Sequence, residues 1–125
     1  MHAEEIRKKD QYLKKLVSAA RAVISNQVAL PFGVIRIVRI LAWLQPLSDV
    51  EYPIFRSFLY EAERQSLPLS TDRLLWNPDK LAEKDEQLQE IVERYRKDII
   101  EECWNITKAY GQPQSKPEEP GRAQI

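Results

Sequence analysis

A long amphipathic segment between Asn77 and Gly111 constrains this chain more than any other feature. Asn77 is a good N-cap, Pro78 suits the first helical position, and Gly111 favours the end of a helix. Between them, apolar residues recur at steps of three, four and seven, as on one face of a helix of about nine turns. The predicted apolar face consists of Leu81, Leu88, Ile91, Val92, Tyr95, Ile99, Cys103, Ile106 and Tyr110.

Two segments nearer the N-terminus also show helical periodicity. Residues 3–26 carry apolar side chains on one side, and their first turn holds acidic residues, which a helix N-terminus favours. Residues 32–44 are almost wholly apolar, and their β-branched residues would suit a strand. Strand alternation would separate Arg36 and Arg39 by two or four residues, whereas they are three apart, so we predict a helix. Its composition predicts that this helix is the innermost one.

A third helix is expected next, with two alternative starts. Ser48 and Glu51 have the spacing of a capping box, which would start the helix just after Ser48. Pro53 would then fall beyond the first turn, so the helix could instead begin beside Pro53. In either case the apolar stripe predicts that it ends near Gln65.

Together these segments predict an all-α fold: an irregular four-helix bundle with a short extra helical turn and a flexible C-terminal tail. Residues 66–70 are the predicted connector and residues 71–76 the predicted extra turn. Residues 1–110 should form a single helical domain, because 125 residues with 43% apolar side chains can bury one modest core. Residues 111–125 are the predicted tail, since their prolines and polar residues cannot offset the entropy lost on ordering.

The charge of the chain is balanced as a whole but divided along its length. Lysine plus arginine equals aspartate plus glutamate at 19 each, so no overall field attracts nucleic acid or an anionic membrane. Residues 1–47 hold eight basic and three acidic side chains, a net charge of +5. Residues 48–110 hold nine basic and fourteen acidic side chains, a net charge of −5. The two halves either neutralise each other in the fold or present two surfaces of opposite sign.

Few residues in the chain suit catalysis or metal binding. The only histidine is His2, beside the N-terminus. Cys103 lies on the apolar face of the long helix beside acidic residues, where we expect a buried core thiol. No carboxylate has the Glu-x-x-His spacing of a helical di-iron site. We therefore predict no metal, no cofactor and no enzymatic activity.

The sequence also favours a particular compartment. Residues 1–15 are charged throughout, unlike a secretory signal, and one cysteine cannot form an intramolecular disulfide. Residues 28–47 are apolar enough to suggest a membrane span, but Arg36 and Arg39 would each cost about 2.5–3.5 kcal/mol at its centre. We therefore expect a cytoplasmic protein without a membrane-spanning segment.

Two groups of basic residues each allow two interpretations. Arg36 and Arg39 lie in an apolar helix, so they would either form salt bridges with acids of the second half or bind an anion. Glu61 and Glu63 are the candidate acids. The basic residues of the first helix form a ridge that is either a solvated face or a nucleic-acid contact, and the scarcity of nearby aromatic residues favours the former. This basic ridge consists of Arg7, Lys8, Lys14, Lys15 and Arg21.

The second half of the chain resembles a family of small uncharacterised bacterial helical proteins over about residues 58–106. In that family a histidine-containing segment usually precedes the Leu-Pro pair, and its absence from this chain argues against a shared active site. The resemblance implies a cytoplasmic bacterial accessory protein, a class that includes small antidotes made beside toxins. It is carried by Phe58, Leu67-Pro68, Arg73-x-x-Trp76-x-Pro78, Leu81-Ala82-x-Lys84-Asp85, and Tyr95-Arg96 before Cys103.

The leading hypothesis is a protein–protein binding module, most concretely an immunity protein that neutralises a bacterial toxin by masking it. Acidic residues would steer a basic toxin surface, and aromatic residues near charges would anchor it, although a tryptophan beside a loop also commonly packs on the core. The alternative is a nucleic-acid-associated regulatory protein that uses the basic ridge. The predicted partner-binding residues are Tyr60, Glu63, Asp72, Trp76, Glu83, Asp85 and Glu86.

Overall fold

The computed structural model describes residues 3–65 and 77–111. No strand occurs in these ranges, so the predicted all-α fold is confirmed, including the helix across the β-branched run. The predicted connector and extra turn, and all of the predicted tail beyond residue 111, lie outside the described residues. The elements are α1 (Ala3–Ile24), α2 (Leu30–Leu44), the 3₁₀ helix η1 (Gln45–Leu47), α3 (Pro53–Arg64) and α4 (Pro78–Tyr110).

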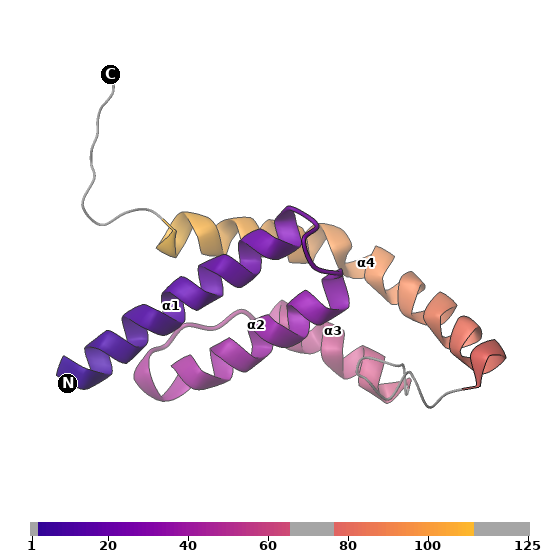
Figure 1. The fold of residues 1–125 in the computed structure, drawn as a ribbon, viewed down its shortest axis with the longest axis horizontal. Helices are drawn as coiled ribbons and strands as arrows, with labels where there is room; N and C mark the ends of the chain where they lie inside the picture. Colours follow the sequence, from indigo (N-terminus) through magenta and orange to yellow (C-terminus); the bar gives the residue numbers. More distant parts are fainter. Residues whose placement is uncertain (1–2, 66–76, 112–125) are drawn as a thin grey trace, which may run out of the picture.

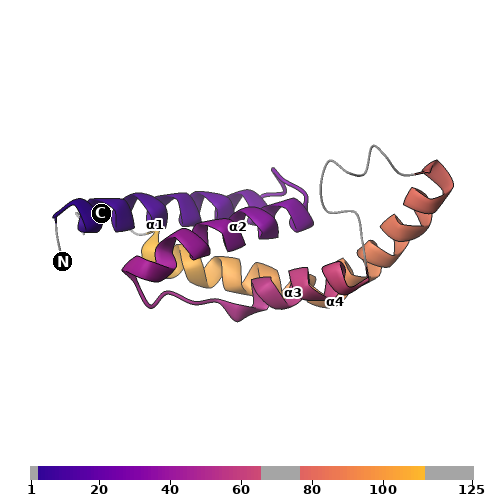
Figure 2. The same ribbon diagram turned by 90° about the horizontal axis from the view of Figure 1, so that it is seen from below.

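The four α-helices form an irregular bundle in which α4 links two parts of the molecule (Figures 1 and 2). α1 and α2 run side by side in opposite directions, and the last part of α4 packs against α1. α3 packs against the middle of α4. The interfaces of α1 with α4 and with α2 are the most extensive, whereas α2 and α4 make only a small contact.

Burial supports the prediction that the second helix is the innermost one, because α2 buries six of its 15 residues, a larger share than α1, α3 or α4. One face of α2 is nevertheless exposed. Phe32 and Trp43 are each 44% exposed, and Arg36 and Arg39 between them are exposed as well. The residues that α2 does bury face α1 and α3, its two main neighbours. An apolar composition does not specify how many helices will cover a face, and here the fold covers only one side of α2.

By length and composition alone, the segment Leu30–Leu47 could cross a membrane, with 18 residues and a mean hydropathy of 1.4. The core helix of a soluble protein meets the same criterion. In the structure this segment runs from α2 into η1, and only 33% of it is buried, whereas such a core helix is mostly buried.

The turn between α1 and α2 follows from local chemistry. Asn26 has a φ of 60°, a left-handed conformation that asparagine tolerates. The amide of Gln27 donates to the carbonyl of Ala22 at 2.9 Å, and the amide of Asn26 donates to the carbonyl of Val23 at 3.2 Å. These two hydrogen bonds form a Schellman motif at the end of α1. One turn into α2, a Cβ on Gly33 would lie 2.3 Å from Cγ2 of Val23. The close approach of the two helices therefore requires glycine at this position.

The ends of α3 and α4 test three sequence signals. Oδ1 of Asn77 accepts hydrogen bonds from the amides of Asp79 at 2.9 Å and Lys80 at 3.4 Å, so the predicted N-cap is confirmed. α4 also ends where the sequence predicts. α3 begins at Pro53 without a side-chain cap, so the alternative start is confirmed and the capping-box start is wrong. No residue from 48 to 52 is helical, so no helix follows Ser48 directly.

The core is built from all four α-helices. Phe55 and Phe58 of α3 are its largest fully buried side chains, and the ring of Phe58 meets that of Tyr95 edge-on with centroids 5.6 Å apart. Cys103 is fully buried, as predicted. The predicted apolar face of α4 is buried only from its third turn onward, at Leu88, Ile91, Val92, Ile99, Cys103 and Ile106.

The first ten residues of α4 extend beyond the rest of the described bundle (Figures 1 and 2). None of residues 78–87 is more than partly buried, and Leu88, which is 9% exposed, is the first buried residue of α4. In Figure 2 this end of α4 curves away from the other helices. Nζ of Lys84, on this end of α4, donates to the carbonyl of Gln65 at 3.3 Å. Gln65 directly follows α3, so this hydrogen bond connects the end of α4 to the end of α3. The projecting end is therefore a largely solvated helix.

Candidate protein-binding surface

One face of α4 carries a row of acidic residues. Their spacing of four, three, four and three keeps them on one side of the helix over about 21 Å. All five are exposed. Two have a basic neighbour at 3.6 Å, Lys80 for Glu83 and Arg96 for Glu93, and the other three form no ion pair within the described ranges. This acidic stripe consists of Asp79, Glu83, Glu86, Glu90 and Glu93.

The structure brings together part of the predicted set on α4. Glu83 and Glu86 belong to the acidic stripe, whereas Asp85 lies half-buried on another side of the helix. Sequence reasoning missed Asp79, Glu90 and Glu93 as members of the stripe. The alternating steps of four and three would have identified them.

The other predicted residues do not lie on the stripe. Tyr60 is 68% exposed on α3, and Glu63 is exposed on the last turn of the same helix. Tyr60 lines a shallow groove of about 500 Å³ with residues of α3 and with Tyr95. Asp72 and Trp76 lie outside the described residues.

A polar contact joins α3 to α4 beside this groove. The carboxylate of Glu61 accepts hydrogen bonds from the guanidinium of Arg94 and, at 3.1 Å, from the hydroxyl of Tyr95. The hydrogen bond from Arg94 lowers the pKa of Glu61 below its usual 4.5; burial opposes this effect, and the bond from Tyr95 adds to it. Burial and the bond to Glu61 raise the pKa of Tyr95. These contacts link α3 to α4, and the positive charge of Arg94 balances the negative charge of Glu61.

The predicted salt bridges of Arg36 and Arg39 are wrong, because Glu61 pairs with Arg94 and Glu63 pairs with neither arginine. The two arginines instead belong to an exposed row on α2 with spacing four, three and four. At one end of the row, Trp43 packs on Tyr12 of α1 with ring centroids 5.6 Å apart. We call this row the arginine–aromatic stripe; it consists of Phe32, Arg36, Arg39 and Trp43.

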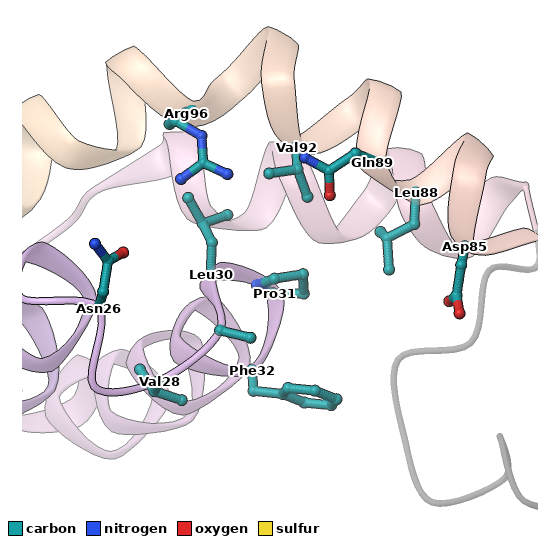
Figure 3. A pocket seen from close by; sticks show the side chains of 11 residues that line it. Asn26, Val28, Leu30, Pro31, Phe32, Asp85, Leu88, Gln89, Val92 and Arg96 are labelled. Atoms are coloured by element: carbon teal, nitrogen blue, oxygen red, sulfur yellow. The ribbon is translucent and has the colours of Figure 1, made fainter.

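A groove of about 450 Å³ lies between the beginning of α2 and the middle of α4 (Figure 3). Its apolar lining comes from both sides, with Leu30 and Phe32 facing Leu88 and Val92 across it. Charged and polar side chains lie along the α4 side of the groove. They are Asp85, Gln89 and Arg96.

Reactive chemistry has little support in the described residues. No group of three histidine, cysteine, aspartate or glutamate side chains there is arranged to hold a metal ion. Burial, with a smaller effect of the Glu102 charge, raises the pKa of Cys103 to about 12. That thiol is protonated at neutral pH and is a weak nucleophile. Burial and a hydrogen bond with Tyr110 also raise the pKa of Tyr52.

No family model, curated protein or solved structure matches this chain.

Proposed function

We propose that this chain is a protein-binding module for a basic protein surface, and most concretely an immunity protein that masks a bacterial toxin domain. The observation that carries the proposal is the acidic stripe, which begins on the projecting end of α4. Like charges on adjacent turns repel one another in the free protein. A basic partner would relieve that repulsion and be steered toward the stripe.

Two neighbouring features supply contacts that charge alone does not. The ring of Tyr60 is 68% exposed on α3, and tyrosine is a frequent anchor of protein interfaces. The groove in Figure 3 has an apolar lining that a side chain of the partner could bury. The proposed mechanism is steric occlusion of the partner, which requires no catalytic group on this chain.

The proposal also agrees with what the family resemblance implies, a cytoplasmic bacterial accessory protein. The competing proposal, nucleic-acid binding through the basic ridge, has weaker support. Arg7 pairs with Glu4, and Arg21 donates to the carbonyl of Gly111 at 3.5 Å, so two cations of the ridge have partners. Non-specific nucleic-acid binding commonly has a Kd of about 10⁻⁴–10⁻⁶ M. Binding tighter than that at about 150 mM salt, lost on reversing Lys14 and Lys15, would favour the competing proposal.

The experiment expresses the neighbouring reading frame in bacteria with and without this chain. The proposal expects that the neighbour stops growth, that this chain restores it, and that the two proteins co-purify. Glu83→Lys with Glu86→Lys should abolish the rescue, because it reverses the centre of the acidic stripe.

The matched control is Asp98→Lys with Glu101→Lys, which reverses two exposed acids three residues apart on α4 beyond Glu93, the last residue of the stripe. This variant should rescue growth like the wild-type chain. A harmless neighbour, or equal rescue by both double variants, would refute the proposal.

A further inference from the structure

We propose that the arginine–aromatic stripe of α2 binds the acidic stripe of α4 on a second copy of this chain. This inference shares the acidic stripe of α4 with the proposed function, but it adds Arg36 and Arg39 of α2, which that proposal does not use. It commits to self-association of the chain through two different surfaces.

The first observation is the matching spacing of the two stripes. The arginine–aromatic stripe from Phe32 to Trp43 has steps of four, three and four, and the acidic stripe from Asp79 to Glu90 has the same steps. Each run covers about 16 Å of helix. Steps that alternate between four and three residues are those of helices that pack side by side over several turns. Two such helices can therefore meet along their whole stripes.

The second observation is the opposite charge of the two stripes. α2 contains two arginines and no acidic residue, and neither arginine forms an ion pair within residues 3–65 and 77–111. The acidic stripe carries five carboxylates. Arginine presents a planar set of donors that suits carboxylates in an interface.

The third observation is that the fold does not use these charges internally. Four ion pairs each lie within one half of the chain: Arg7 with Glu4 in the first, and Lys80, Arg94 and Arg96 with acids in the second. The +5 and −5 halves therefore present surfaces of opposite sign rather than neutralising each other through such pairs. In a second copy of the chain, the acidic surface would complement the basic surface of the first copy, and the basic surface would complement the acidic one.

The exposed rings make the contact more than a pair of salt bridges. Exposed salt bridges alone contribute little, whereas arginine with flanking aromatic rings is the composition of interface centres. Phe32 and Trp43 are each 44% exposed at the two ends of the stripe. A helix lying over Arg36 and Arg39 would bury part of both rings. Because the contact joins different surfaces, it continues from copy to copy unless it closes into a ring.

The test measures the sedimentation of the full chain over a range of concentrations, at about 50 mM and about 500 mM salt. We expect reversible association at low salt that weakens at high salt. Arg36→Glu with Arg39→Glu should raise the Kd about tenfold or more, and Glu86→Arg with Glu90→Arg should do the same. Neither change breaks an ion pair of the described residues.

The decisive step mixes the two double variants. In each variant alone, the reversed pair meets charges of its own sign on the other stripe. Together the two reversed pairs are complementary, so association should return in the mixture. A variant that had merely lost its fold would not recover. The control, Arg56→Glu with Lys108→Glu, changes the net charge by the same amount as the α2 variant at exposed positions outside both stripes, and it should leave the Kd unchanged within about twofold.

A chain that stays monomeric at every concentration would overturn the inference. So would association that survives both reversals, that fails to return in the mixture, or that depends on co-purified nucleic acid. The α2 variant also separates this inference from the proposed function. It should still protect against the toxin, whereas the Glu83 and Glu86 double variant should not.

Discussion

The hydroxyl of Tyr95 donates a hydrogen bond of 3.1 Å to the carboxylate of Glu61, and this contact ties α3 to the middle of α4. The guanidinium of Arg94 binds the same carboxylate. These residues join α3 to the helix that carries the acidic stripe. The stability of this link can be measured through its dependence on pH.

We expect Glu61→Gln to lower the free energy of unfolding by about 1 kcal/mol at pH 7, because a neutral amide pairs less strongly with Arg94. The folded-state pKa of Glu61 is depressed, so its contribution is fully present above about pH 4.5 and is lost as pH falls through the folded-state pKa. Urea unfolding across this range should show the two proteins converging in acid. Glu63→Gln, an exposed control two residues away, should differ from wild type by less than about 0.5 kcal/mol. An equal deficit for Glu61→Gln at pH 3 and pH 7 would contradict the assignment.

A second prediction concerns the crossing of α1 and α2. Alanine favours a helix over glycine by about 1 kcal/mol, but a Cβ at Gly33 would lie 2.3 Å from Cγ2 of Val23. Overpacking commonly costs about 1–3 kcal/mol, so Gly33→Ala should have a net cost of about 1–2 kcal/mol in thermal or urea unfolding. Combined with Val23→Ala, which removes the obstructing methyl groups, its cost should shrink. Strict additivity of the two changes would show that the side chains do not collide.

The N-cap of α4 gives a local prediction. Asn77→Ala removes the acceptor of the amides of Asp79 and Lys80 and should cost about 1 kcal/mol. Because the first turns of α4 bury no side chain, the loss should appear as faster amide hydrogen exchange at the start of the helix. Exchange near Ile99 should change little. Asn105→Ala, an exposed asparagine within the helix, is the control. Uniformly faster exchange along α4 would mean that its projecting end is not an independent unit.

The accuracy of the sequence predictions depended on the range of the interactions involved. The start of α4 was predictable because Asn77 acts on amides two and three residues away. Two local signals predicted different first residues for α3. The helix begins at Pro53, whose ring holds φ at a helical value, and not at the capping box formed by Ser48 and Glu51. The pairing of Glu61 with Arg94 spans 33 residues, and nothing in the local pattern specifies it.

The same distinction explains the errors about α2. The run from Val34 to Ile40 was correctly predicted as a helix, because the spacing of its arginines is local. The exposure of one face of α2 was not predicted, because it depends on how α1 and α3 pack against this helix. The acidic stripe was predicted in part, through Glu83 and Glu86, because acidic residues were grouped by position in the chain rather than by helix face.

Cys103 should resist thiol reagents in the native protein. It is fully buried, and burial raises its pKa to about 12, so both access and thiolate formation are suppressed. Labelling should be complete only in denaturant, as followed by mass spectrometry. The unfolded chain is the internal control for reagent reactivity. Rapid labelling of the folded protein at pH 8 would show that the region around Ile99 and Ile106 opens readily, and the packing described for α4 would then be wrong.

The last prediction separates charge from anchoring in the proposed partner complex. Glu83→Lys with Glu86→Lys should mainly slow association and weaken its dependence on salt, because exposed charges act on the encounter. Tyr60→Ala should mainly speed dissociation, because a ring buried in an interface holds the formed complex.

Surface plasmon resonance at several salt concentrations resolves the two rates. Both variants should first match the wild-type chain in helicity and melting, which is expected since all three side chains are exposed. Asp98→Lys with Glu101→Lys again controls for charge alone, and should leave both rates within about twofold. If folded variants of the stripe and of Tyr60 bind with unchanged rates, the acidic face of α4 is only a solvated surface. The binding face would then have to be sought on the basic ridge of α1.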